Sequence, residues 1–155
     1  STRLSRAWGA PMIYPGNIHG SLVGEAYRQG KIAGSVEFGV ANFSTRPERI
    51  WGRTGVINLF REVGMLPGEP EFELEQDQFT VKTMTKIITD RGGFLHERVK
   101  AGDRVSGGDT LALMMSLDGE EIAVFEAPHD GVVARRNTMG VVGTGDIIAY
   151  VAEVA

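Results

Sequence analysis

The residue best placed to do chemistry is Glu37, in the short run Ser35-Val36-Glu37-Phe38-Gly39. The apolar residues just before it predict a buried strand over about 32–39. In open α/β sheets the functional groups lie just beyond the carboxyl ends of the strands. Glu37 is therefore a candidate general base or metal ligand, and the alternative is a solvated carboxylate at the rim of a sheet.

The three histidines are the other side chains with catalytic potential. His19 lies where a turn leads into a helix, and it approaches Glu37 only if that turn lies beside the strand; a capping or exposed position is the alternative. His96 is expected at a β edge and His129 in a turn. Alternating acidic residues occupy 69–77, but they have no histidine beside them, so a solvated strand face is favoured over a metal site.

The bulk composition excludes several classes of function. The chain has 155 residues, a net charge of -4 and no cysteine. Disulfides, thiolate metal sites and cysteine nucleophiles are therefore excluded, and no basic face for nucleic acid is indicated. No apolar run approaches the roughly 18–20 residues of a membrane span, so a cytoplasmic protein is expected. The chain begins without methionine and runs straight into a helical pattern, so we expect that an upstream portion is missing.

The first half of the sequence predicts α/β structure. We expect a strand at 12–14, a helix capped by Ser21 and ended by Gly30, the strand with Glu37, and a second helix that starts at Ser44 or Thr45 and ends near Val63. Strand, helix and strand in this order place the strands parallel. The positions expected to face inward are Leu22, Val23, Ala26 and Tyr27 in the first helix and Val56, Leu59, Phe60 and Val63 in the second.

The second half predicts an all-β module. A stretch rich in proline, glycine and glutamate over 66–77 indicates a boundary, which gives domains 1–75 and 76–155. Short β segments are expected at 80–88, 93–95, 110–115, 122–126, 131–134 and 147–152. The run Gly108-Asp109 followed by an apolar strand is echoed by Gly145-Asp146, so we expect a small barrel or sandwich with pseudo-twofold symmetry.

The β module resembles biotinyl and lipoyl carrier domains. The resemblance lies in Val99-Lys100-Ala101-Gly102-Asp103-Arg104-Val105-Ser106-Gly107-Gly108-Asp109 and in Ala127-Pro128-His129-Asp130-Gly131-Val132-Val133. In that family a lysine at the tip of the central hairpin carries the cofactor. The equivalent tip here is 116–121, and no lysine follows Lys100. A carrier function is therefore excluded, and the module is expected to be structural, a lid or an interaction surface.

The chain as a whole resembles the C-terminal half of the succinylglutamate desuccinylase/aspartoacylase family of zinc-dependent deacylases. The most specific parts are 21–39, which include Glu25-Ala26-Tyr27-Arg28-Gln29-Gly30-Lys31, and 92–151. The resemblance implies an α+β fold: the C-terminal remnant of a zinc-carboxypeptidase-like α/β domain, followed by the lipoyl-like β barrel or sandwich.

The function that this family implies is hydrolysis of an N-acyl amino acid or related small amide. The position that matches the family's proton-transferring glutamate is Glu37, and the cofactor is zinc. The family's metal motif His-x-x-Glu is absent, because Leu22, Val99 and Val132 stand three residues after the three histidines. No zinc ligand or substrate-binding residue is therefore assigned in this chain, and the residues after Gly39 also depart from the glycine-rich family pattern.

These observations leave two functions open. The first is a part of a deacylase that acts with the missing N-terminal half, and the second is a metal-free adaptor that uses the β module as a docking surface. Self-association is compatible with an edge-rich β module beside an exposed helix. No nucleic-acid or membrane partner is expected.

Overall fold

The computed structural model describes residues 2–16, 19–39, 44–72 and 78–155, and it divides into two compact units, Ser1–Thr80 and Val81–Ala155. The expected acidic strand face over 69–77 lies largely outside the described residues. The part of the chain that is described holds no helix with the length and apolar character needed to cross a membrane.

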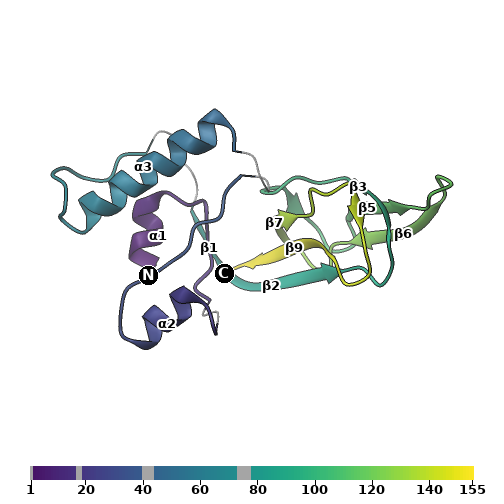
Figure 1. Cartoon of the computed structure of the whole chain (residues 1–155), viewed down its shortest axis with the longest axis horizontal. Coiled ribbons are helices and arrows are strands. Elements are labelled where there is room, and N and C mark those ends of the chain that lie inside the picture. The colour runs from purple at the N-terminus through teal and green to yellow at the C-terminus, as the bar shows by residue number, and fades with distance from the viewer. Residues whose placement is uncertain (1, 17–18, 40–43, 73–77) are drawn as a thin grey trace. The chain divides into compact units, whose positions relative to one another are not determined.

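The described residues of the first unit form three helices and a short parallel β pair (Figure 1). The helices are α1 (Thr2–Trp8), α2 (Leu22–Arg28) and α3 (Arg46–Glu62). Strand β1 (Met12–Ile13) pairs with the first two residues of β2 (Phe79–Ile88), with Met12 opposite Phe79. The expected strand at 12–14 is therefore present, with a partner from the other end of the unit.

The helix ends follow local capping chemistry. Ser21 accepts a hydrogen bond from the Gly24 amide at 3.0 Å, which confirms it as the N-cap of α2. Thr45 and Glu48 form a capping box at the start of α3. Gly30 and Gly64 follow the ends of these helices with φ of 72° and 75°, a conformation that glycine adopts without strain.

The inward faces of the helices differ from the expected ones. The buried residues of α3 are Gly52, Gly55 and Asn58. Val56, Phe60 and Val63, which were expected inside, are 41%, 41% and 51% exposed. The two glycines let α1 and the chain before α3 approach closely, and the apolar side chains lie on other faces of the helix. The expectation for α2 was also wrong at two positions, because Leu22 and Tyr27 are exposed.

The second unit consists of strands from β2 to β9 (Figure 1). Strands β2, β9, β7 and β4 pair in that order, and β6, β5, β3 and β8 form a second sheet. The described strands thus make two open sheets and no closed barrel. The bounds of the strands after β2 are β3 Gly93–Glu97, β4 Arg104–Val105, β5 Thr110–Met115, β6 Glu121–Glu126, β7 Gly131–Arg136, β8 Val141–Val142 and β9 Ile147–Val154.

The core of the second unit lies between these sheets. Two buried clusters, one around Leu111, Val133 and Val151 and one around Met114 and Ile148, draw residues from both sheets. Met114 is fully buried and its neighbour Met115 is not, as the alternation of a strand predicts. Each large apolar side chain that is fully buried contributes about 1.5–3 kcal/mol, so this unit has a substantial core.

The first unit has much less core than the second. Its buried hydrophobic residues, among those described, are Ala7 and Ile13. Its exposed large hydrophobic residues are Tyr14, Leu22, Tyr27, Ile32, Phe38, Ile50, Val56, Phe60, Val63, Met65, Leu66 and Phe72. Two buried side chains of this size stabilise a fold by only a few kcal/mol, about 1.5–3 for the larger one.

The glycine–aspartate turns of the second unit share one geometry. In each, the aspartate Oδ2 accepts the amide hydrogen of the residue three positions earlier: Asp103 from Lys100, Asp109 from Ser106 and Asp146 from Gly143, at 2.7–2.8 Å. The glycine before each aspartate has φ near 90°. The repeat seen in the sequence is therefore a repeated turn, and each copy is followed directly by a strand.

Candidate functional site

Residues 32–39, here called the extended segment, carry Glu37 without forming a strand. No described residue hydrogen-bonds to the backbone of this segment, and Ile32, Glu37 and Phe38 are exposed. The prediction of a buried strand is wrong for this chain, because a strand needs a neighbour to pair its N–H and C=O groups and the described residues supply none here.

Aromatic contacts hold one end of the extended segment against α3. The rings of Phe38 and Trp51 meet edge to face with centroids 5.4 Å apart, and Trp51 meets Trp8 of α1 at 6.0 Å. A Cβ at Gly52 would lie 2.8 Å from the Phe38 ring, and one at Gly55 would lie 2.3 Å from Trp8. The glycines of α3 therefore leave space for these rings. The ring contact with Trp51 holds Phe38, the residue next to Glu37, against α3.

The carboxylate of Glu37 has no described partner. It makes no hydrogen bond or ion pair with any other described residue of the first unit, and it does not line either of the two hollows described below. Gly39, two residues later, has φ of 85°, so the chain turns immediately after the anchored phenylalanine. The Glu37 side chain is therefore exposed, and the described residues of the first unit place no catalytic partner beside it.

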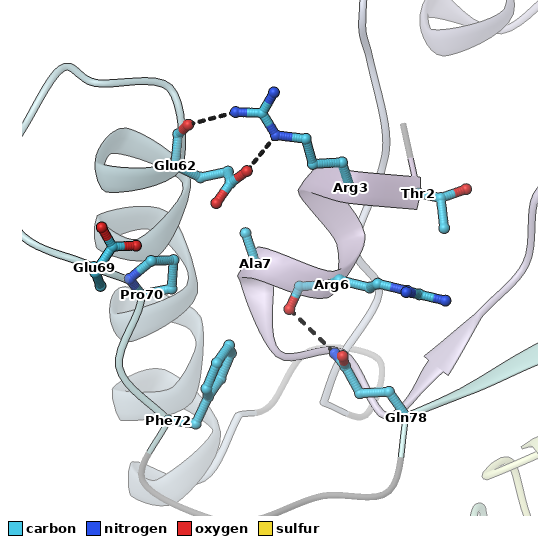
Figure 2. Close-up of a pocket in the computed structure, with 9 residues that line it drawn as sticks. All are labelled: Thr2, Arg3, Arg6, Ala7, Glu62, Glu69, Pro70, Phe72 and Gln78. Carbon is cyan, nitrogen blue, oxygen red and sulfur yellow. Dashed lines mark hydrogen bonds and ion pairs between the residues drawn. The ribbon is translucent and has the colours of Figure 1, made fainter.

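One hollow of about 590 Å³ is lined by α1, the end of α3 and residues 69–72 (Figure 2). Arg3 spans it, with an ion pair to the Glu62 carboxylate and a 2.8 Å hydrogen bond from Nη2 to the Glu62 carbonyl. Gln78 donates to the carbonyls of Arg6 and Ala10 at 3.2 and 3.0 Å. These contacts tie α1 to its neighbours, and the hollow is wide open, so we assign it a structural role.

A second hollow lies along α2 and the residues just before it, and His19 is among the residues that line it. Its lining includes His19, Ser21, Glu25 and Arg28, and its volume is about 610 Å³. Two hydrogen bonds of 2.8 Å join the Arg28 guanidinium to the Glu25 carboxylate. The hydrogen bonds from Arg28 and, with a smaller effect, the one from Gln29 hold the pKa of the Glu25 carboxyl below its ordinary value. Sequence reasoning missed the pair, although its spacing of three on a helix is a known signal for such contacts.

The other two histidines lie in the second unit. His96 is exposed on β3, opposite Leu113. His129 lies in a turn as expected, with Nε2 3.0 Å from the Thr85 hydroxyl and Nδ1 2.8 Å from the Asp130 carbonyl. The Thr85 and Asp130 contacts fix the His129 ring and give it a structural role.

The described residues do not fit a zinc ion. Zinc needs three or four histidine, cysteine, aspartate or glutamate ligands in close geometry. Within the described ranges no group of three such residues could hold a metal. The described residues therefore do not supply a donor set for the cofactor that the resemblance implies.

Comparison with known proteins identifies relatives along nearly the whole chain. It is 28% identical over 161 residues to the N-alpha-acetyl-L-2,4-diaminobutyric acid deacetylase of Halomonas elongata, an alignment that covers 97% of this chain and 46% of that protein. The product-bound ectoine utilization protein EutE (DoeB) of Ruegeria pomeroyi superposes with a TM-score of 0.87 at 23% identity, over 97% of this chain and 48% of that one.

A second solved structure shows the same relationship. The succinylglutamate desuccinylase/aspartoacylase of Rhodobacter sphaeroides superposes with a TM-score of 0.83 at 21% identity, over 99% of this chain and 48% of that one. No protein-family model matches the chain. The fold is therefore shared with these proteins, and the chain spans about half of the length of the relatives it matches.

Proposed function

We propose that this chain, whose homologues and structural neighbours are members of the succinylglutamate desuccinylase/aspartoacylase family, is part of a deacylase that hydrolyses an N-acyl amino acid. The observation that carries the proposal is the similarity to a named deacetylase along 97% of the chain. A shared fold alone would not carry it, because one fold hosts many activities.

In this proposal Glu37 is the residue that moves protons. Its carboxylate accepts a proton from the water whose oxygen attacks the acyl carbon. It then donates that proton to the amine nitrogen as the carbon–nitrogen bond breaks, which yields a carboxylic acid and a free amine. The contact of Phe38 with Trp51 supports this role, because it anchors the residue next to Glu37 while the carboxylate stays accessible.

The proposal includes zinc only as a metal ion that the longer protein would bind. The resemblance implies the metal, but the described residues contain no ligand set for it. Any ligands must therefore come from outside those residues, and no step of the reaction is assigned to a metal here.

The second unit is proposed to be a lipoyl-like sandwich without a carrier function. Its β5–β6 hairpin ends in Ser116, Leu117 and Asp118, and Leu117 is 88% exposed. A swinging arm needs a lysine at this tip, and the chain has none after Lys100. An intact mass that shows biotin or lipoate on the chain would overturn this assignment.

The test of the catalytic role is Glu37→Gln in the longer protein that contains these residues. Gln keeps the size of the side chain but cannot accept the proton, so kcat should fall by roughly 10²- to 10⁴-fold on the best substrate of an N-acyl amino acid panel. The matched control is Glu121→Gln, because Glu121 is also exposed and lies on β6. Retention of full activity by Glu37→Gln would refute the assignment of Glu37.

A further inference from the structure

The sequence contains two Asp-Gly pairs, and the structure places them in different surroundings. Asp118 and Gly119 lie at the tip of the β5–β6 hairpin. Asp130 ends the turn that follows β6, and Gly131 begins β7. Aspartate followed by glycine is the pair in which the backbone most readily closes a ring onto the side chain, because glycine has no Cβ to hinder the approach of its nitrogen. The surroundings of each pair therefore decide whether it reacts.

The reaction of such a pair needs only water. The backbone nitrogen of the glycine attacks Cγ of the aspartic acid, the nitrogen loses its proton, and the carboxyl hydroxyl leaves as water. The product is a cyclic imide, the succinimide. Addition of one water molecule then opens either of its two carbonyl–nitrogen bonds, which returns aspartate or leaves isoaspartate, whose main chain runs through Cβ and Cγ. The net change is an isomerisation, so the mass of the chain is unaltered.

The hydrogen bonds at the hairpin tip leave the Asp118 carboxyl free to react. No hydrogen bond or ion pair joins this carboxyl to another described residue, and Asp118 is exposed. The tip is instead organised by Ser116, whose hydroxyl accepts from the amides of Asp118 and Glu120, each at 3.2 Å. Its carbonyl accepts from the Gly119 amide at 3.1 Å. Only this last bond occupies the attacking nitrogen.

The Gly119 peptide also has room to rotate. Its φ is 83°, and a Cβ added there would meet nothing within 4 Å. Attack on Asp118 therefore requires the loss of one turn hydrogen bond and the displacement of no described neighbour. Opening of a single turn at a loop tip is among the motions of a folded chain that need the least free energy.

The other pair is held at the groups that would have to move. Oδ1 of Asp130 accepts the Gly107 amide hydrogen at 2.8 Å, and the Asp130 carbonyl oxygen lies 2.8 Å from Nδ1 of His129. Gly131 begins β7, which pairs with both β4 and β9, and a Cβ there would lie 2.3 Å from the carbonyl oxygen of Ala152. Attack on Asp130 therefore requires separation of paired strands.

We propose that Asp118 is a site of spontaneous covalent modification, at which the hairpin tip isomerises to isoaspartate while Asp130 stays unmodified in the folded chain. The proposal goes beyond the deacylase activity and uses residues of the second unit alone. Isoaspartate lengthens the main chain between the two amides that the Ser116 hydroxyl binds. The modification should therefore alter the end of the β5–β6 hairpin and leave the buried clusters of this unit intact.

Prolonged incubation of the folded 155-residue chain in neutral buffer tests the proposal. Endoproteinase Asp-N cleaves before aspartate and not before isoaspartate, so digestion of the incubated and then denatured chain should lose cleavage before Asp118 and keep it before Asp130. Electron-transfer fragmentation of the peptides identifies the isomer at each site. In the folded chain Asp118 should isomerise at least about 100-fold faster than Asp130, because opening of a turn needs much less free energy than separation of paired strands.

Two controls separate the effect of the structure from that of the sequence. In guanidinium chloride the chain is unfolded and both pairs are released, so their rates should agree within about threefold. Asp118→Glu keeps the charge, but its longer side chain does not form the succinimide. This variant should abolish the change at position 118 and leave the slow rate at Asp130 as it was.

Three results overturn the proposal. The first is equal rates at the two sites in the folded chain, because the surroundings would then have no influence on the reaction. The second is faster isomerisation at Asp130 than at Asp118. The third is a folded chain that stays unmodified at Asp118 while the unfolded chain reacts there, because the Ser116 hydrogen bonds would then protect the tip.

Discussion

The packing of β7 on β9 makes a sharp prediction at Gly131, the first residue of β7. A Cβ added there would lie 2.3 Å from the carbonyl oxygen of Ala152 and 3.1 Å from Cγ1 of Val151. Real Cβ contacts essentially never fall below 3.0 Å, so the strands must separate by roughly 0.7 Å. Because the obstructing atom is backbone in the middle of a paired strand, it cannot swing aside as a side chain would.

The cost of Gly131→Ala follows from two opposing effects. Overpacking of this kind costs about 1–3 kcal/mol, and the loss of glycine flexibility in the unfolded chain returns about 0.4–1 kcal/mol. The net destabilisation should be about 1–2 kcal/mol. For a cooperative unit of this size, each kcal/mol lowers Tm by roughly 4–8 °C.

The assay is urea and thermal unfolding of the full 155-residue chain, followed by far-ultraviolet circular dichroism. The matched control is Gly140→Ala, because a Cβ at Gly140 meets nothing within 4 Å. That variant should stay within about 0.5 kcal/mol of the parent. If Gly131→Ala is as stable as Gly140→Ala, the close approach of these two strands is refuted.

Two further predictions concern charge and metal. Hydrogen bonds from the Lys82 ammonium and, with a smaller effect, from the Thr83 hydroxyl hold the pKa of the Glu153 carboxyl below its ordinary value. The ionised carboxylate therefore stabilises the pairing of β2 with β9 at pH values above the pKa of the unfolded chain. This stabilisation is lost as the pH falls through the pKa of the folded chain. Lys82→Met should therefore raise the Glu153 midpoint in a carbon-detected NMR titration, and an unchanged midpoint would contradict the described pairing. Elemental analysis of the purified 155-residue chain should find well under one zinc ion per chain, because its described residues supply no set of zinc ligands. One zinc ion per chain that a chelator removes would contradict the absence of such a ligand set from the described residues.

Local features of the fold could be predicted from the sequence, because their causes lie within a few residues. The caps at Ser21 and Thr45 need only a side-chain oxygen and the next turn of backbone. The Gly-Asp turns need only four residues, and the hydrophobic alternation around Met114 needs only one strand. The assignment to a deacylase family rested on the order of several such short runs.

The errors came from features that depend on distant neighbours. The pattern 32–39 is compatible with a strand, but a strand also needs a partner, and the described chain supplies none there. The apolar spacing of α3 did not predict its buried face, because Trp8 and Phe38 pack over Gly55 and Gly52 instead. The role of Glu37 stays a prediction, since the surroundings that define a general base are not among the described residues.

The edge-to-face pair of Trp8 and Trp51 also determines what optical spectroscopy can see. The chain has two tryptophans, and both lie in the first unit, whereas most of the strands lie in the second. Indole fluorescence therefore reports on one unit, and the β-sheet ellipticity signal reports on the other. Unfolding transitions that fail to coincide between these two probes would describe two units with separate stabilities, without any labelling or mutation of the chain.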